Sequence, residues 1–292
     1  MSFADRPRRG LESPKQILAR YGLRPKKDWG QNFLGDEDVL DDIAAACRLG
    51  PGETVVELGA GLGHLTRALA ATGAKIVAVE RDRELVAVLQ KELAELPNVT
   101  VLAANAADVD FEAIAGAPRP VIAGNLPYQL SSSILFQVVA QRAQVKRAVF
   151  LLQKEVAERI AAPPGGRDYG LLSVLLQAFA FVEVAFEVPA HRFHPPPKVD
   201  SAVAVLELAD PPRAEVRDVE RFIRLVKAAF AQRRKTLLNS LKSGRLVEDP
   251  AQLTFALQRA GIDGGRRAET LCALEFAKLE RELAQAIDSR GS

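Results

Sequence analysis

Short apolar segments alternate with amphipathic segments along the first half of the chain. β-branched and apolar runs predict strands, which lie in residues 54–61, 75–82, 98–108 and 120–128 and at the start of residues 147–160. Amphipathic spacing predicts helices between them, including one around Leu65 to Ala71. This alternation predicts a parallel sheet that is covered by helices on both faces. Ligands of such sheets bind beyond the carboxyl ends of the strands.

The pattern changes after the fifth strand. Two further apolar stretches, residues 181–189 and 199–208, are separated only by AHRFHPPPK, residues 190–198. That connection is too short for a crossover helix, so the two stretches are expected to form an antiparallel pair at one edge of the sheet. The sequence therefore predicts a mostly parallel α/β sheet with an antiparallel edge.

A second, helical domain is expected near the C-terminus. The proline-rich segment at residues 209–213 ends the strand pattern, and only helical periodicity follows, through Ile287. A chain of 292 residues, of which 48% are hydrophobic and 26% charged, is long enough for one large core and a smaller second unit. We predict a sheet domain with a basic N-terminal extension in residues 1–209 and a small helical domain in residues 210–292.

Positive charge is concentrated in two segments although the net charge of the chain is only +2. Residues 1–27 hold eight Lys and Arg against two acids, and residues 217–245 hold nine against two. Two such segments in a nearly neutral chain fit a partner with a phosphate backbone better than a small neutral metabolite. The alternative, basic side chains on solvated helix faces, explains one such segment more readily than both.

Neither a membrane span nor a metal site is predicted. Residues 1–10 lack the apolar core of a secretion signal, and the most apolar stretch, residues 171–182, is interrupted by a glutamine. We therefore expect a cytoplasmic protein. His191 and His194 have the spacing of a ligand pair, but three prolines follow them and no third ligand accompanies them. No exposed apolar stripe is evident, which favours a monomer.

The first chemical motif is VVELGAGLGHLT, residues 55–66. Its glycines let the backbone turn tightly and approach a ligand closely at a junction between a strand and a helix. The G-x-G-x-x-G spacing of dinucleotide sites fails, because His64 stands where the third glycine should be. Glu57 would repel a pyrophosphate but suits a ligand with positive charge. Glu80, at the end of the next strand, is placed to accept hydrogen bonds from ribose hydroxyls. A cationic nucleoside without phosphate describes S-adenosylmethionine, whereas the alternative is a structural turn with two surface acids.

The second motif is Asn125-Leu126-Pro127-Tyr128, where an apolar strand runs directly into a helix. The exocyclic amine of adenine is a poor nucleophile because its lone pair is delocalised into the ring. The Asn125 side-chain oxygen and the Leu126 carbonyl oxygen could both accept a hydrogen bond from that amine and stabilise the charge that develops on it. Tyr128 would stack on a base that has left its helix or loop. The motif therefore predicts a cradle for adenine.

Seven pieces of the sequence, in order, resemble the ribosomal RNA adenine N6-dimethyltransferases over nearly the whole chain. The pieces are GQNFL (30–34), ELGAGLGHLT (57–66), VERD (79–82), GNLPY (124–128), LLQKEVAERI (151–160), FHPPPKVDSAV (193–203) and QRRKTLLNSL (232–241). The resemblance implies a class I methyltransferase domain, Rossmann-like and dependent on S-adenosylmethionine, followed by a small helical RNA-binding domain.

Within this family the last two pieces favour the housekeeping branch. Its members methylate two adjacent adenosines in a hairpin loop near the 3′ end of small-subunit rRNA to N6,N6-dimethyladenosine, and an immature small ribosomal subunit is the implied partner. The resistance branch shares the catalytic core but acts on a large-subunit adenine. Two further alternatives stay open: a ribosome-assembly factor whose binding matters more than its catalysis, and a DNA adenine methyltransferase.

The resemblance also assigns roles to single residues. The catalytic residues would be Asn125, Leu126, Pro127, Tyr128 and Phe193, with Phe193 closing the target pocket opposite Tyr128. The methyl donor would contact Asn32, Leu34, Glu57, Gly59, Gly61, Glu80, Arg81, Asn105, Ala106 and Asn125, and RNA would contact Arg233, Arg234 and Lys235. One position departs from the family pattern, since Asn105 stands where an aspartate is usual. Asparagine keeps an oxygen acceptor but loses the charge, so weaker donor binding is expected.

Overall fold

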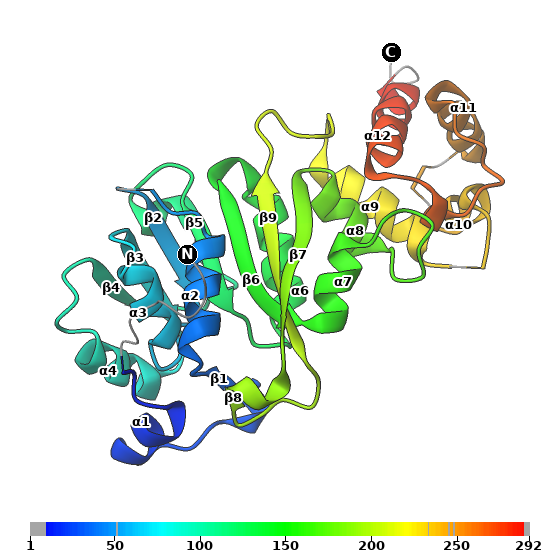
Figure 1. The fold of residues 1–292 in the computed structure, drawn as a ribbon. Coiled ribbons are helices and arrows are strands. Elements are labelled where there is room, and N and C mark those ends of the chain that lie inside the picture. Colours follow the sequence, from blue (N-terminus) through cyan, green and yellow to red (C-terminus); the bar gives the residue numbers. More distant parts are fainter. Residues whose placement is uncertain (1–9, 51, 233, 245, 248, 289–292) are drawn as a thin grey trace. The chain divides into compact units, whose positions relative to one another are not determined.

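The structure is a computed structural model that describes residues 10–50, 52–232, 234–244, 246–247 and 249–288 (Figure 1). It divides into two compact units. The first extends to Ala157 and includes Glu183–Leu208, and the second comprises Glu158–Val182 and the chain from Ala209 onward. No helix in the described ranges is long and apolar enough to cross a membrane.

A seven-stranded sheet forms the framework of the first unit, with the strand order β4-β3-β2-β5-β6-β9-β7. The strands are β2 Thr54–Leu58, β3 Lys75–Glu80, β4 Val99–Ala103, β5 Val121–Asn125, β6 Arg147–Gln153, β7 Ala180–Val188 and β9 Ser201–Leu208. Neighbours from β4 to β6 pair in parallel, whereas β9 runs antiparallel to β6. The predicted parallel sheet with an antiparallel edge is confirmed, and β7 lies beside β9 at that edge.

Helices alternate with these strands as the periodicity predicts. They are α2 Glu37–Ala46, α3 His64–Ala70, α4 Arg83–Glu92, α5 Phe111–Ala115, α6 Ser131–Ala140 and α7 Lys154–Ala161. All residues of β2 are buried, and so are those of β6 up to its last residue. Such continuous burial is typical of strands that are covered on both faces, which explains why β2 and β6 are apolar runs rather than alternating ones.

A small two-stranded sheet joins the N-terminal segment to the connection between β7 and β9. In this sheet, β1 (Phe33–Leu34) pairs antiparallel with β8 (Phe193–His194), and Leu34 lies opposite Phe193. We expected residues 190–198 to be a plain connection. Strands of two residues are too short to produce a periodic signal, so the sequence pattern gave no indication of this pairing.

The second unit is helical, with α8 Leu171–Gln177, α9 Val219–Phe230, α10 Leu237–Ser243, α11 Pro250–Ala260 and α12 Ala273–Asp288. We expected a helical domain in residues 210–292; in the structure this unit resumes at Ala209, and Glu158–Val182 groups with the C-terminal helices rather than with the sheet. Aromatic contacts explain that grouping. The Tyr169 ring meets Phe230 edge to face at 6.2 Å between centroids, and Phe179 meets Phe222 at 6.0 Å.

Candidate active site

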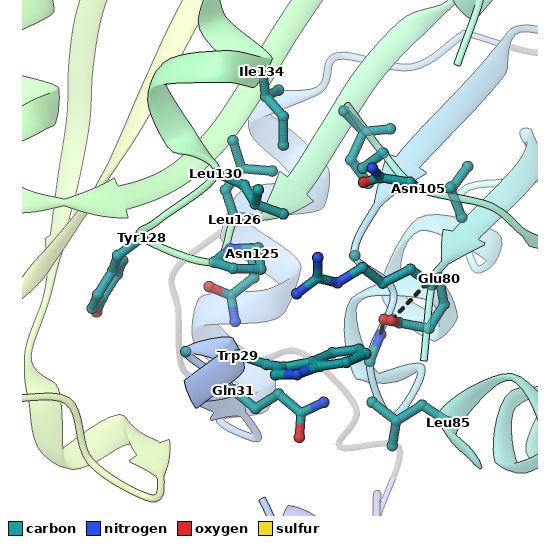
Figure 2. Close-up of a pocket in the computed structure, with 18 of the residues that line it drawn as sticks. Trp29, Gln31, Glu80, Leu85, Asn105, Asn125, Leu126, Tyr128, Leu130 and Ile134 are labelled. Carbon is teal, nitrogen blue, oxygen red and sulfur yellow. Dashed lines mark hydrogen bonds between the residues drawn. The ribbon is translucent and has the colours of Figure 1, made fainter. Parts of the chain in front are cut away.

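A cavity of about 70 Å³ lies beyond the carboxyl ends of β2, β3, β4 and β5, where the sheet topology predicts a ligand. Most of the predicted site residues line it (Figure 2). They are Asn32, Gly59, Gly61, Glu80, Arg81, Asn105, Ala106, Asn125, Leu126, Pro127 and Tyr128. The structure therefore brings together residues that are up to 96 positions apart in the sequence, from Asn32 to Tyr128.

The glycine-rich turn after β2 needs its glycines for two reasons. Gly59 and Gly61 have φ angles of 77° and 60°, in the left-handed region that favours glycine. A Cβ atom on Gly61 would also lie only 3.2 Å from the Phe33 ring. The Gly59 N–H donates to the Val79 carbonyl at 2.9 Å, which holds the turn against the end of β3. The turn thus brings bare backbone to the wall of the cavity.

Glu80 is held rigidly at the end of β3. The residue is 8% exposed, and its side chain accepts three backbone hydrogen bonds, from Gly61 at 3.0 Å, Arg81 at 2.8 Å and Asp82 at 2.9 Å. Burial nevertheless raises the pKa of the carboxyl above its ordinary value. This preoriented acid faces the cavity (Figure 2), as expected for a group that binds ribose hydroxyls.

Glu57 lies beside this cavity rather than in it. It lines an adjoining cavity together with Leu34 and His64, and the two cavities share Gly59 and Asn125 among their lining residues. Only 1% of the Glu57 residue is exposed, and its Oε2 atom has no hydrogen-bond partner within the described residues. Burial raises the pKa of the carboxyl to about 8. Thr66 lies close enough to lower this pKa, but the buried Oε2 atom has no hydrogen-bond partner in the described residues and suits a positively charged group.

Asn125 ends β5 with its side chain tethered to the N-terminal segment. Its Nδ2 donates to the Asn32 carbonyl at 2.9 Å, so the orientation of the amide is fixed. The preceding residue has to be glycine, since a Cβ atom on Gly124 would lie 2.5 Å from the Leu58 carbonyl oxygen. Leu126 is 1% exposed, and its N–H donates to the Leu151 carbonyl at 3.2 Å. The tetrapeptide is thus held by hydrogen bonds to β6 and to the N-terminal segment.

The two aromatic residues expected to hold the target base are placed differently. Tyr128 is half-buried at the cavity, and its ring stands apart from the Asn125 side chain (Figure 2). Its hydroxyl lies 3.0 Å from Ser201 Oγ. Phe193 is 5% exposed, packs in the same core cluster as Leu34 and lines neither cavity. The structure thus brings Tyr128 to the cavity, whereas Phe193 packs in a core cluster with Leu34.

The sequence reasoning missed Trp29, which lines the cavity from the N-terminal segment. The Arg81 guanidinium lies over its ring at 4.2 Å from the centroid, and the Lys26 amine lies at 5.1 Å. Lys26 also pairs with Asp82 at 2.8 Å, and Gln31 Nε2 donates to Asp82 at 3.0 Å. Trp29 directly precedes the GQNFL motif and follows Lys27 and Asp28, and only the structure shows that it lines the cavity.

Asn105, the departure from the family pattern, forms a local turn after β4. Its Oδ1 accepts from the Ala107 N–H at 3.3 Å, and its Nδ2 donates to Asp108 at 2.7 Å. Asn105 and Ala106 line the cavity. The three residues expected to contact RNA belong to the other unit: Arg234 and Lys235 are exposed, and Arg233 lies outside the described residues.

The residues present fit S-adenosylmethionine as a ligand. The glycine turn offers bare backbone, Glu80 offers a fixed acid for hydroxyl groups, and Glu57 has a buried oxygen without a partner close to the turn. Together they suit a nucleoside with positive charge and without phosphate. Across the part of the chain that the structure describes, no group of three or more His, Cys, Asp or Glu side chains is arranged to hold a metal ion.

Comparisons with known proteins place the chain in a family. A family model described as ribosomal RNA adenine dimethylase matches residues 22–285. A protein of Myxococcus xanthus (strain DK1622) described as ribosomal RNA small subunit methyltransferase A is 59% identical over 273 residues, which cover 94% of this chain and 96% of that protein. Its namesake in Anaeromyxobacter sp. (strain K) is 55% identical over 281 residues, covering 93% and 98%.

Solved structures agree with this placement. A dimethyladenosine transferase from Plasmodium falciparum has a TM-score of 0.76 at 25% identity and covers 87% of this chain and 98% of its own. The 23S rRNA methyltransferase ErmE has a TM-score of 0.67 at 27% identity and covers 87% and 100%. The predicted class I methyltransferase fold is confirmed. The chain belongs to the ribosomal RNA adenine dimethylase family, as the seven sequence pieces indicated, and is an S-adenosylmethionine-dependent enzyme that methylates adenine in ribosomal RNA.

Proposed function

We propose that the protein transfers methyl groups from S-adenosylmethionine to N6 of two adjacent adenosines in a hairpin loop near the 3′ end of small-subunit rRNA, giving N6,N6-dimethyladenosine. The observation that carries the proposal is the Asn125 amide, oriented by its hydrogen bond to the Asn32 carbonyl at the edge of a cavity that suits a cationic nucleoside. The small-subunit names of relatives that are 59% and 55% identical support this substrate over a large-subunit adenine.

Donor binding relies on groups that are fixed before the donor arrives. The Glu80 carboxylate, held by three backbone N–H groups, accepts from the ribose hydroxyls. Glu57 faces the positive charge from the adjoining cavity, and Gly59 and Gly61 let the methionine part approach the backbone. Asn32 and Leu34 cover the donor from the N-terminal segment, while Arg81, Asn105 and Ala106 border its adenine. When bound, the donor supplies a methyl group on a sulfonium.

Catalysis by this chain consists of positioning and electrostatic stabilisation. The Asn125 side-chain oxygen and the Leu126 carbonyl oxygen accept from the N6 amine and direct its lone pair away from the ring and toward the methyl group. Pro127 keeps the Leu126 backbone extended, so its carbonyl stays available. The same oxygens stabilise the positive charge on N6 in the transition state. As the bond between N6 and the methyl carbon forms, the bond between that carbon and the sulfonium sulfur breaks, and S-adenosylhomocysteine leaves. The N6 proton is then lost to water, and a second donor molecule methylates the monomethylated amine in the same way.

The target base is held by stacking. Tyr128 offers its ring to an adenine that has left its loop, a contact that contributes about 1–3 kcal/mol per base. Phe193, which pairs with Leu34 in the small sheet and packs in the same core cluster, supports the wall that carries Leu34. In the second unit, Arg234 and Lys235 contact phosphates without reading sequence, as does Arg233, which lies outside the described residues. The first unit is thus the methyltransferase domain and the second the RNA-binding domain of a monomer that acts on immature small subunits in the cytoplasm.

The proposal is tested by transfer of radiolabelled methyl groups to small ribosomal subunits that lack the modification, followed by nucleoside analysis. Naked small-subunit rRNA, large subunits and a DNA hairpin of the same sequence are assayed in parallel. We expect dimethyladenosine in small-subunit rRNA alone. Label in large-subunit RNA would assign the protein to the resistance branch, label in the DNA hairpin would make it a DNA methyltransferase, and tight subunit binding without label would favour an assembly factor.

A further inference from the structure

Tyr128 has a hydroxyl contact that stacking on a base does not require. Its Oη lies 3.0 Å from Ser201 Oγ, and either hydroxyl can be the donor. Ser201 is the first residue of β9 and is fully buried at 0% exposure, although it carries a polar side chain. A buried hydroxyl without a partner is costly. The contact with Tyr128, which lies 73 positions earlier in the chain, therefore accounts for the burial of the Ser201 hydroxyl.

Ser201 is a rigid point of attachment. It pairs with Gln153 in the antiparallel ladder between β9 and β6. The residue before it is anchored twice, because the Asp200 carbonyl accepts from the Lys154 N–H at 3.0 Å and the Asp200 side chain accepts from the Ala190 N–H at 2.8 Å. The position of the Ser201 hydroxyl is thus set by the sheet and not by a mobile loop.

The Tyr128 ring is consequently held at both ends. At its backbone end, the Leu130 N–H donates to the Pro127 carbonyl at 2.8 Å, which closes the turn around Tyr128. At its far end, the hydroxyl meets Ser201. Tyrosine has two side-chain torsions, and a ring fixed only by its backbone can change both of them. A ring that is fixed at both ends offers one plane to an incoming base.

We propose that Ser201 is a positioning residue for methyl transfer, whose hydroxyl holds the Tyr128 ring in the plane on which the target adenine stacks. The inference rests on the proposed function, because it assumes that Tyr128 stacks on the target base. Ser201 touches neither the base nor the donor and acts only through Tyr128. Its effect therefore falls on the RNA substrate and leaves the donor affinity unchanged.

The test is a double-mutant cycle of Ser201→Ala and Tyr128→Phe, measured as kcat/KM for small subunits that lack the modification. One neutral hydrogen bond corresponds to a factor of about 2–10, so each single variant should lose activity by such a factor. The double variant should lose no more than either single variant, because both changes remove the same hydrogen bond. The dissociation constant of S-adenosylmethionine should stay within twofold of that of the parent protein. Losses that multiply, or full activity in Ser201→Ala, would overturn the role of Ser201.

A second readout separates positioning from stability. Burial raises the pKa of the Tyr128 hydroxyl, and the hydrogen bond with Ser201 lowers it, because the Ser201 hydroxyl can donate to the ionised phenolate oxygen. In protein labelled with 13C at tyrosine Cζ, which contains three tyrosines, Ser201→Ala should move the titration of Tyr128 to higher pH and leave the other two unchanged. Ser173→Ala is the matched control, since that serine is also fully buried and donates to the Arg159 carbonyl. It should lower the melting temperature without changing methyl transfer or the Tyr128 titration.

The failure of this inference can be told apart from the failure of the proposed function. If Tyr128→Ala keeps full activity, the target base does not depend on stacking on Tyr128, and the role assigned to Ser201 is then also refuted. If Tyr128→Ala is inactive while Ser201→Ala matches the parent, the proposed function stands and only the positioning role is lost. If Ser201→Ala does not fold, Tyr128→Phe still removes the same hydrogen bond, and its full activity would overturn the proposal.

Discussion

Glu57 allows a quantitative test of how the donor is held. Burial raises the pKa of its carboxyl to about 8, and the negative charge of Glu80 adds to the rise. At pH 7 a group with that pKa carries a proton about nine tenths of the time. A cation placed beside a carboxyl favours its ionised form and lowers its pKa. Donor binding at pH 7 should therefore release about 0.9 proton per site.

The same linkage predicts how the affinity for the donor changes with pH. The donor binds the ionised carboxylate, so affinity increases as the pH rises toward the pKa of about 8 and levels off above it. Between pH 6 and pH 7 the ionised fraction grows about tenfold, which corresponds to about 1.4 kcal/mol of binding free energy. An α-amino group has a pKa of about 8, so that of the donor stays largely protonated in this interval.

Isothermal titration calorimetry with S-adenosylmethionine measures both quantities. The parent protein and Glu57→Gln are titrated at pH 6 and pH 7 in two buffers that differ in ionisation enthalpy, which gives the number of protons released. Glu57→Gln should show less than a twofold change in affinity and no released proton from this site. Comparing the two proteins removes the contribution of every other titrating group to the proton release, including that of His64 in the same cavity. Equal pH profiles in the two proteins would refute a contact between Glu57 and the positive charge.

Three further predictions concern the cavity walls. Asn125→Ala should abolish methyl transfer in the radiolabel assay, because it removes the oriented amide. The circular dichroism spectrum should stay unchanged, because the sheet is kept, and full activity would refute the role of the motif as a cradle for adenine. Arg81→Ala should change the fluorescence of Trp29, the single tryptophan of the chain, since it removes the cation over its ring; an unchanged emission spectrum would contradict this. Gly124→Ala should lower the free energy of unfolding in urea by about 1–3 kcal/mol, because its Cβ would lie 2.5 Å from the Leu58 carbonyl oxygen.

Matched controls exist for two of these variants. Arg83→Ala removes a neighbouring arginine that lies on α4 and does not line the cavity, so the emission of Trp29 should not change. Gly170→Ala adds a Cβ whose nearest neighbour would lie 4.0 Å away, on a backbone with φ of −165°. That φ is extended and open to any residue, so the loss of stability should be smaller than for Gly124→Ala.

The framework of the fold could be predicted because its signal is local. Strands buried on both faces, such as β2 and β6, are continuous apolar runs that stand out in the sequence. The Glu158–Val182 segment could not be assigned from pattern alone, because its place depends on contacts such as Tyr169 with Phe230. Helical periodicity indicates that a segment has an apolar face, but it does not indicate against which core that face packs.

The candidate site was likewise predicted only in part from the sequence. The glycine turn, Glu80 and the Asn125 tetrapeptide were predicted, because each lies at a strand end and carries a recognisable chemical group. Trp29 was missed, since a lone aromatic residue in a loop carries no periodic signal. Phe193 pairs with Leu34 and packs in the core cluster, and its expected place at the target pocket stays a prediction. The positions of such residues depend on contacts between segments that are distant in the sequence. These contacts are seen only in the folded chain.

The hydrogen bond from Asn125 to the Asn32 carbonyl means that the orientation of this side-chain amide depends on two parts of the chain. The sheet supplies the side chain, but the N-terminal segment supplies the acceptor that aims it. A shortened protein without that segment would keep β5 and its tetrapeptide and still lack a directed amide. The position of the N-terminal segment therefore determines the orientation of the Asn125 amide.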